Sequence, residues 1–150
     1  MEKKVLSTPA FYVSYFLKKN RIEYYDRMSE VRRNGNYEQW IKFFLLALSE
    51  AAEDATETVD KLIELHDRTE KIINSFGKTK KSVLKLLTYL EENPIIEIGK
   101  TAEALNIAYN TAARAVNLMA ENNILVQSGK AGKTKIYSYE EYLKILRKDT

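Results

Sequence analysis

Residues 79 to 139 carry the pattern that most constrains how this chain can fold. A stretch with helical spacing stops at Asn93-Pro94, because the residue before a proline avoids the helical region of backbone space. A short β-branched run follows, and after it come two helical stretches separated by a tight turn. Two alternating segments then flank a tip that contains glycine and lysine. The order helix, strand, helix, turn, helix, hairpin leaves few folds to choose from.

The separate elements can be placed along this region. Its first helix should open at Thr79 or Lys80 and bury Val83, Leu84, Leu87 and Leu90. After it we expect a strand over 95–98, a helix over 100–105, a turn at Asn106-Ile107, a helix over 109–122 that ends at a left-handed Asn123, and wing strands over 124–127 and 134–138. A capping box, Ser138-Tyr139-Glu140-Glu141, should open a last helix that reaches about Arg147. This is the order of a winged helix-turn-helix, which lays one helix in a DNA groove.

The first half of the chain is helical in pattern. Thr8-Pro9 suits a helix start, so we expect helices over about 9–17 and 19–33, with Asn34-Gly35-Asn36 as a stop. A long helix should run from Tyr37 to about Phe76, although a break near Glu53-Asp54 is an alternative. Apolar spacing of four and three links Leu48, Ala52, Ala55, Val59, Leu62, His66, Thr69, Ile73 and Phe76. This heptad-like seam predicts packing on other helices, either inside one molecule or in a homodimer along the long helix.

The sequence therefore predicts a mainly α protein with two parts. Residues 1–76 should form a helical bundle with a long helix, and residues 77–150 a winged helix-turn-helix domain with a small β-wing. The net charge of +3 is divided unevenly between them. Residues 1–76 hold 12 basic and 13 acidic side chains, whereas residues 77–150 hold 12 and 8. The positive surplus lies on the part that carries the helix-turn-helix pattern, which favours a nucleic-acid partner.

Composition excludes several classes of site. There are no cysteines, so a disulfide scaffold, cysteine-ligated zinc and a thiol nucleophile are excluded. No apolar run reaches about 18 residues, and the N-terminus lacks the apolar stretch of a signal peptide. We expect a cytoplasmic protein with no membrane association, no cofactor and no metal site. The scattered carboxylates and tyrosines show no pairing of a nucleophile with a base, so we expect no enzymatic activity of this chain.

Duplex DNA is the expected partner of the winged helix. Arginine can pair with guanine or phosphate and asparagine with adenine, and the first residues of a helix favour phosphate. Lysines on a wing are suited to the phosphate backbone. The candidate DNA-binding residues are Tyr109, Asn110, Thr111, Arg114, Asn117, Lys130, Lys133 and Lys135. Winged helices also serve as dimerisation and docking domains, so a protein-interaction role is the alternative.

The two halves together resemble the C-terminal part of Fic-domain proteins. The resemblance rests on residues 8–16, on Asn20-Arg21-Ile22-Glu23-Tyr24-Tyr25 and on residues 31–45, which end in Trp40-Ile41-Lys42-Phe43-Phe44-Leu45. In many members such a block follows the catalytic motif and is itself followed by a helical linker and a winged helix. The resemblance implies a regulatory module of a Fic-family protein, or a module that docks on a Fic adenylyltransferase core.

The chemistry of that family cannot be carried over to this chain. Its signature, H-P-F-x-[D/E]-G-N-G-x-x-R, supports AMP transfer from ATP to a hydroxyl group. The one histidine here, His66, is followed by Asp67, and no glycine-rich loop comes after it. The chain also has Ala108 where many members have a serine before the recognition helix, and Lys133-Thr134-Lys135 where they have wing arginines. Lysine keeps the charge but not bidentate recognition.

Overall fold

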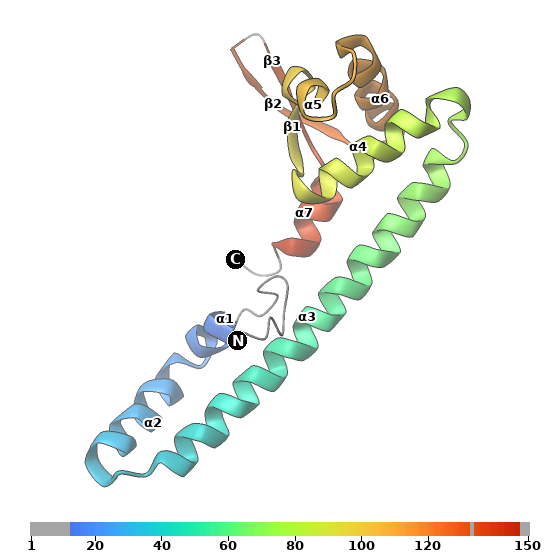
Figure 1. Ribbon diagram of the computed structural model, residues 1–150. Helices are drawn as coiled ribbons and strands as arrows, with labels where there is room; N and C mark the ends of the chain where they lie inside the picture. Colours follow the sequence, from blue (N-terminus) through green and yellow to red (C-terminus); the bar gives the residue numbers. More distant parts are fainter. Residues whose placement is uncertain (1–12, 133, 148–150) are drawn as a thin grey trace, which may run out of the picture. The chain divides into compact units, whose positions relative to one another are not determined.

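The computed structural model describes residues 13–132 and 134–147 (Figure 1). Helices predominate, and one three-stranded antiparallel sheet accompanies them, which confirms the predicted fold class. The chain forms two compact units that divide between Asp60 and Lys61. The division falls within the longest helix, whereas the predicted boundary at 76/77 coincides with the turn that follows this helix.

The first unit contains α1 (Val13–Lys19), α2 (Arg21–Asn34) and the first part of α3 (Tyr37–Ile73). The predicted helix start at Thr8-Pro9 lies outside the described residues. The predicted stop at Gly35 is confirmed: its backbone is left-handed, with φ +66°, and its amide N–H donates to the carbonyl of Val31. Glycine adopts this conformation without a steric penalty, which explains the sharp end of α2.

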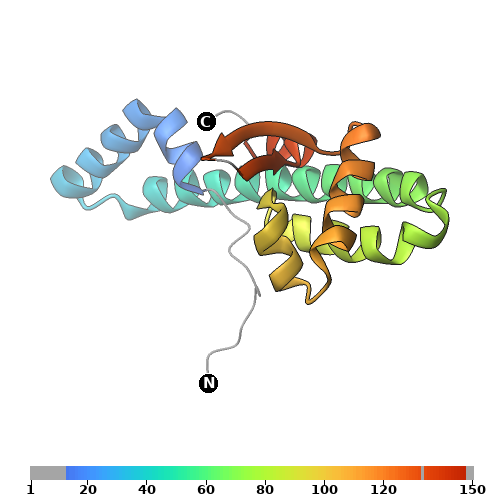
Figure 2. The same ribbon diagram turned by 90° about the horizontal axis from the view of Figure 1, so that it is seen from above.

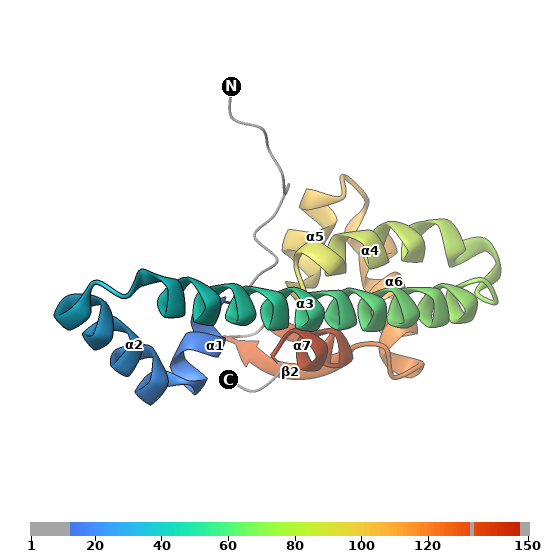
Figure 3. The same ribbon diagram turned by 90° about the horizontal axis from the view of Figure 1, so that it is seen from below.

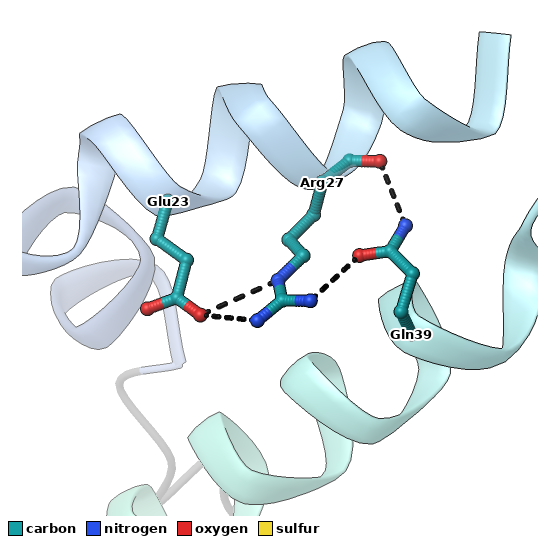
Figure 4. Close-up of polar contacts among 3 residues, drawn as sticks. All are labelled: Glu23, Arg27 and Gln39. Atoms are coloured by element: carbon teal, nitrogen blue, oxygen red, sulfur yellow. Dashed lines mark hydrogen bonds and ion pairs between the residues drawn. The ribbon is translucent and has the colours of Figure 1, made fainter. Parts of the chain in front are cut away.

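The α2–α3 hairpin is held by polar contacts, which Figure 4 shows, and by an aromatic contact. The Arg27 guanidinium donates to Glu23 Oε1 through Nη2 at 2.9 Å and to Gln39 Oε1 through Nη1 at 3.2 Å. The Gln39 amide in turn donates to the Arg27 carbonyl at 3.0 Å. The Trp40 ring meets the Tyr24 ring edge-on, with centroids 5.4 Å apart. No residue of α1 or α2 is fully buried, so this unit has a thin core.

The long helix α3 is continuous through Glu53-Asp54, so the alternative with a break there is wrong (Figure 3). It ends at Ile73, three residues before Phe76, and a short 3₁₀ helix, η1 (Gly77–Thr79), leads into the next element. Gly77 has φ +57°, a left-handed conformation that lets the chain reverse direction. Helical spacing alone did not reveal this earlier end, because Phe76 keeps the apolar pattern beyond the last helical turn.

The second unit has the predicted winged-helix order. After the last part of α3 come α4 (Lys80–Glu92), β1 (Ile95–Glu97), α5 (Ile98–Ala104), α6 (Tyr109–Glu121), β2 (Val126–Ala131), β3 (Thr134–Ser138) and α7 (Glu140–Leu146). In Figure 2, α6 crosses α4, which it contacts, and α5 lies beside both. The buried core cluster of this unit comes from α3, α4, β1, α6 and β3 and from the segments that flank the hairpin: Leu65, Ile73, Val83, Leu86, Leu87, Leu90, Ile96, Ala115, Val116, Met119, Ile124, Leu125, Tyr137 and Tyr139.

The sheet has the strand order β1-β3-β2, with both pairs antiparallel. Tyr137 of β3 is central, since it pairs with Ile96 on one side and with Gln127 on the other. The β2–β3 pairing is irregular between Gln127 and Gly129, which marks a bulge. The hairpin reverses after Ala131, where Gly132 has φ +62°, as two-residue hairpin loops require.

Three details of the predicted elements are wrong. Leu86 is buried on α4, whereas Leu84 is only half-buried, because α3 and α6 together cover a wider arc of this helix than one stripe. Ile98 opens α5 and does not close the strand, since the extended residue that precedes the helix is Glu97. The strand β2 begins at Val126 and reaches Ala131, so Lys130 lies in a strand and not in a loop at the tip.

The predicted capping box at the start of α7 is also wrong. Ser138 is the last residue of β3, and its hydroxyl donates to the Glu140 carboxylate at 2.6 Å. The N-cap of α7 is Tyr139, which makes no side-chain cap bond. Ser138 is fully buried and committed to the sheet, so its hydroxyl meets the first acidic side chain of the helix and not the helix backbone.

The predicted seam of α3 divides into a covered and an uncovered part. In the second unit, Thr69 and Ile73 are buried in the core. In the first unit, Leu48 and Val59 are exposed, and the buried residues of α3 are Phe43, Ala47 and Ala51, which lie on another face. Packing inside the molecule therefore accounts only for the end of the seam.

Candidate nucleic-acid interface

The helix α6 has one strictly apolar face. Its inner positions Ala112, Ala115, Val116 and Met119 are all buried, as the 3.6-residue period predicts. The turn before it is tight because Asn106 adopts a left-handed backbone with φ 50°, and the Ile107 amide then bonds the Ala102 carbonyl at 3.0 Å. Asn123 has a left-handed backbone with φ 58°, so the chain does not continue along the axis of α6, as predicted. Because the inner face is buried and both ends of α6 are fixed by turns, the opposite face of the helix points outward.

The outward face of α6 carries the predicted DNA-binding residues. Tyr109, Asn110, Arg114 and Asn117 are exposed, and Thr111 is half-buried. Asn110, Arg114 and Asn117 line one shallow hollow of about 510 Å³, together with Ala113, Leu118 and Glu121. The structure thus brings the three groups able to read bases onto one surface. Glu121 also lines this hollow and carries the opposite charge, so the positive charge of the hollow comes from Arg114 in the first turns of the helix.

A second hollow joins α6 to the wing. Its volume is about 460 Å³, and Tyr109 and Asn117 from α6 line it together with Lys135 from β3. Thr134 also lines it, although the sequence reasoning did not select this residue. Alternation along β3 does not indicate it, because residues two apart on a strand share a face and the other β3 residues of the hollow, Lys135 and Tyr137, occupy the alternate positions. The remaining lining residues are Ile98, Gly99, Ala113 and Tyr137.

The wing places two lysines directly opposite each other. Lys130 of β2 pairs with Lys135 of β3 in the antiparallel register, and both are exposed. Like charges at directly opposed positions repel, and this costs some stability unless an anion lies between or above them. Lys133, the third predicted wing lysine, lies outside the described residues. In the part of the chain that the structure describes, no acidic side chain forms an ion pair with Lys130, Lys135 or Arg114.

Lys100, another basic residue of the helix-turn-helix, is engaged differently. Its Nζ lies 2.6 Å from Glu97 Oε1, and this hydrogen bond raises the pKa of the lysine. The pair is an exposed i,i+3 pair, so it contributes little to stability. It does reduce the positive charge that α5 presents, which leaves α6 and the wing as the more basic surfaces.

His66 lines neither hollow and instead contacts α4. Its Nδ1 lies 2.5 Å from Glu91 Oε1 of α4, and this hydrogen bond raises the pKa of the imidazole above its usual 6.5. The Tyr142 hydroxyl donates to the Glu91 backbone carbonyl at 2.8 Å. Burial raises the pKa of Tyr142 as well as that of Tyr139. These contacts tie α3, α4 and α7 together, and they lie outside both hollows.

Residues 13–132 and 134–147 lack two features that would have indicated other functions. No cluster of histidine, aspartate and glutamate side chains there could hold a metal ion. None of the helices in this part combines the length and the apolarity needed to cross a membrane. In a comparison with known protein families, no family model matches the chain.

Proposed function

We propose that the second unit binds duplex DNA through α6 and the wing. The observation that carries the proposal is the arrangement around the two hollows: Arg114, Asn110 and Asn117 share one hollow on α6, and Asn117 shares the second with Lys135, which pairs with Lys130 in the β2–β3 hairpin. A helix with this exposed face fits the major groove, and the wing then reaches the adjacent phosphates. A phosphate near Lys130 and Lys135 would relieve their mutual repulsion.

The proposed binding has low sequence specificity. Arg114 is the single arginine of the outward face of α6, and bidentate contacts by arginine to guanine are the commonest specific contacts. Lysines of the wing act as point charges and give affinity that is nearly independent of sequence. The protein is therefore proposed to position itself on the backbone and to read at most a few base pairs.

Fluorescence anisotropy with a labelled duplex tests this function. Affinity at low salt should be measurable and should fall steeply as salt rises, because bound lysines release counterions from phosphates. Arg114→Glu and Lys135→Glu should each weaken binding by at least about tenfold, and Lys135→Glu should reduce the slope of log affinity against log salt by about 1.

Lys144→Glu is the matched control for these two substitutions. Lys144 is an exposed residue of α7, outside both hollows, and its reversal changes the net charge by the same amount. It should leave the affinity nearly unchanged. Absence of duplex binding at low salt would refute the proposal, and so would equal losses from all three substitutions, since these would reflect net charge and not a surface.

We also propose, from the resemblance of residues 8–16, 20–25 and 31–45 together with the winged helix that follows them, that the chain is an accessory module related to Fic-family proteins. Its expected lack of adenylyl transfer follows from the missing signature around His66 and Asp67. Incubation with ATP labelled on the α-phosphate should leave the chain and added protein substrates unlabelled. Label transfer that survives the His66→Ala substitution would show chemistry that the sequence does not anticipate, and any transfer at all would overturn this part of the proposal.

A further inference from the structure

The long helix α3 carries a second apolar face in the first unit, next to the one that packs inside the molecule. Its members recur with spacing four and three: Ile41, Leu45, Leu48, Ala52, Ala55 and Val59. We call these six residues the α3 stripe. The four large ones are between 37% and 55% exposed. The buried residues Phe43, Ala47 and Ala51 form a neighbouring row with spacing four, and Ala51 flanks the stripe on that side.

The spacing of the stripe indicates that a helix covers it. Regular alternation of four and three residues keeps an apolar seam in line with a second helix that runs alongside. The stripe spans residues 41–59, or about 28 Å of helix. Among the described helices of this chain, those other than α3 have at most 14 residues, which is about 21 Å. A helix of sufficient length is α3 itself, with 37 residues.

The positions that flank the stripe suit a partner with the same sequence. In the heptad they are mainly Ser49, Ala51, Thr56 and Thr58, which are uncharged. The hydroxyls of Thr56 and Thr58 donate to carbonyls of their own helix at 2.9 and 2.8 Å, so these side chains need no polar partner. The charged flanking residue Lys42 is paired with Glu38 at 2.7 Å. Two copies can therefore meet without opposing like charges.

The middle of the stripe favours close approach of two helices. Ala52 and Ala55 lie at its centre, with Leu45 and Leu48 on one side and Val59 on the other. Small residues at the centre let two backbones approach, and larger ones on either side fill the space between them. The same patch on both subunits gives a closed, isologous pair, the commonest symmetry of homo-oligomers.

We infer that the chain forms a symmetric homodimer in which the α3 stripes of two copies pack against each other. The interface lies wholly in the first unit and does not depend on the DNA-binding function proposed above. It shares Leu48, Ala52, Ala55 and Val59 with the seam that the sequence predicted and extends it to Ile41 and Leu45, whereas Thr69 and Ile73 of that seam are buried inside one molecule.

Sedimentation equilibrium of the full chain over a concentration series tests the inference. The chain should be dimeric, and Leu48→Glu should raise the dissociation constant by about a hundredfold, because a symmetric pair receives the buried charge twice. Leu46→Glu is the matched control. Leu46 is 65% exposed and lies off the stripe, so its replacement should leave the dimer intact. Equal dissociation by both substitutions would overturn the inference.

A second measurement keeps the test decisive if Leu48→Glu fails to fold. The chain has no cysteine, so Ala52→Cys provides a single thiol at the centre of the stripe. A short thiol-to-thiol crosslinker should join two Ala52→Cys chains and should not join two Leu46→Cys chains. A wild-type chain that stays monomeric at the highest concentrations would refute the homodimer, and residues 1–12 or another protein would then have to cover the stripe. Duplex binding measured on the same samples separates this outcome from failure of the DNA-binding proposal.

Discussion

The hydrogen bond between Thr69 and Tyr139 joins residues 70 positions apart and tests how α3 is attached to the winged helix. Thr69 Oγ1 lies 2.9 Å from Tyr139 Oη, and the two residues are 3% and 1% exposed. Removal of either hydroxyl leaves the other buried without this partner. Tyr139→Phe deletes only the phenolic oxygen, and Thr69→Val keeps the shape of the side chain.

The expected magnitude follows from the burial of both groups. A hydrogen bond contributes about 1 kcal/mol net, but a buried polar group left without a partner costs about 1–3 kcal/mol. We therefore expect each single substitution to lower the free energy of unfolding by about 1–2 kcal/mol. The double variant removes both polar groups, so its loss should be smaller than the sum of the single losses by about 1 kcal/mol.

Urea unfolding followed by far-UV circular dichroism measures these differences. Tyr137→Phe serves as the control, because Tyr137 is a buried neighbour in β3 whose hydroxyl makes no hydrogen bond with another described residue. It should change the free energy of unfolding by less than about 0.5 kcal/mol. Additive losses from Thr69→Val and Tyr139→Phe would refute the reasoning, since two residues that do not interact show no coupling.

Two further predictions concern stability. Because the hydrogen bond to Glu91 raises the pKa of His66, its contribution is fully present below pH 6.5 and is lost as the pH rises through the higher folded-state pKa. The pair is partly exposed, so the effect should stay below about 1 kcal/mol, and Glu91→Gln should remove the pH dependence in urea unfolding at pH 6 and pH 8. Ala108 is the N-cap of α6 with an extended backbone and no side-chain cap bond. Ala108→Ser should raise stability by about 1 kcal/mol, and an unchanged unfolding midpoint would contradict this.

Local sterics and periodicity made much of the second unit predictable from short windows of sequence. Pro94 stops α4 because it keeps the preceding Asn93 out of the helical region, and Asn123 stops α6 because asparagine tolerates the left-handed conformation. The inner face of α6 followed from the 3.6-residue period, and this also fixed which residues point outward. The exposure of Arg114 and Asn117 therefore follows from local periodicity, without knowledge of the tertiary contacts.

The register of the strands and the choice of packing partners cannot be predicted from such short windows of sequence. The opposition of Lys130 and Lys135 depends on the pairing of β2 with β3, and a shift of one residue would separate these side chains. The hollow that Lys135 shares with Asn117 arises only when the wing folds back toward α6. The expected DNA-binding residues could therefore be named from the sequence, but not which of them lie together.

Local sequence patterns predict that the chain is mainly helical, that α3 is long and amphipathic, and where most elements of the winged helix lie. These properties depend on residues within a few positions of one another. Which apolar face of α3 is covered depends instead on long-range packing. Around Ile73 the helix supplies the core of the winged helix, whereas around Leu48 a second face stays exposed. The reason is physical: periodicity shows that a face is apolar, but burial requires another surface against it, and that surface comes from residues far away in the chain.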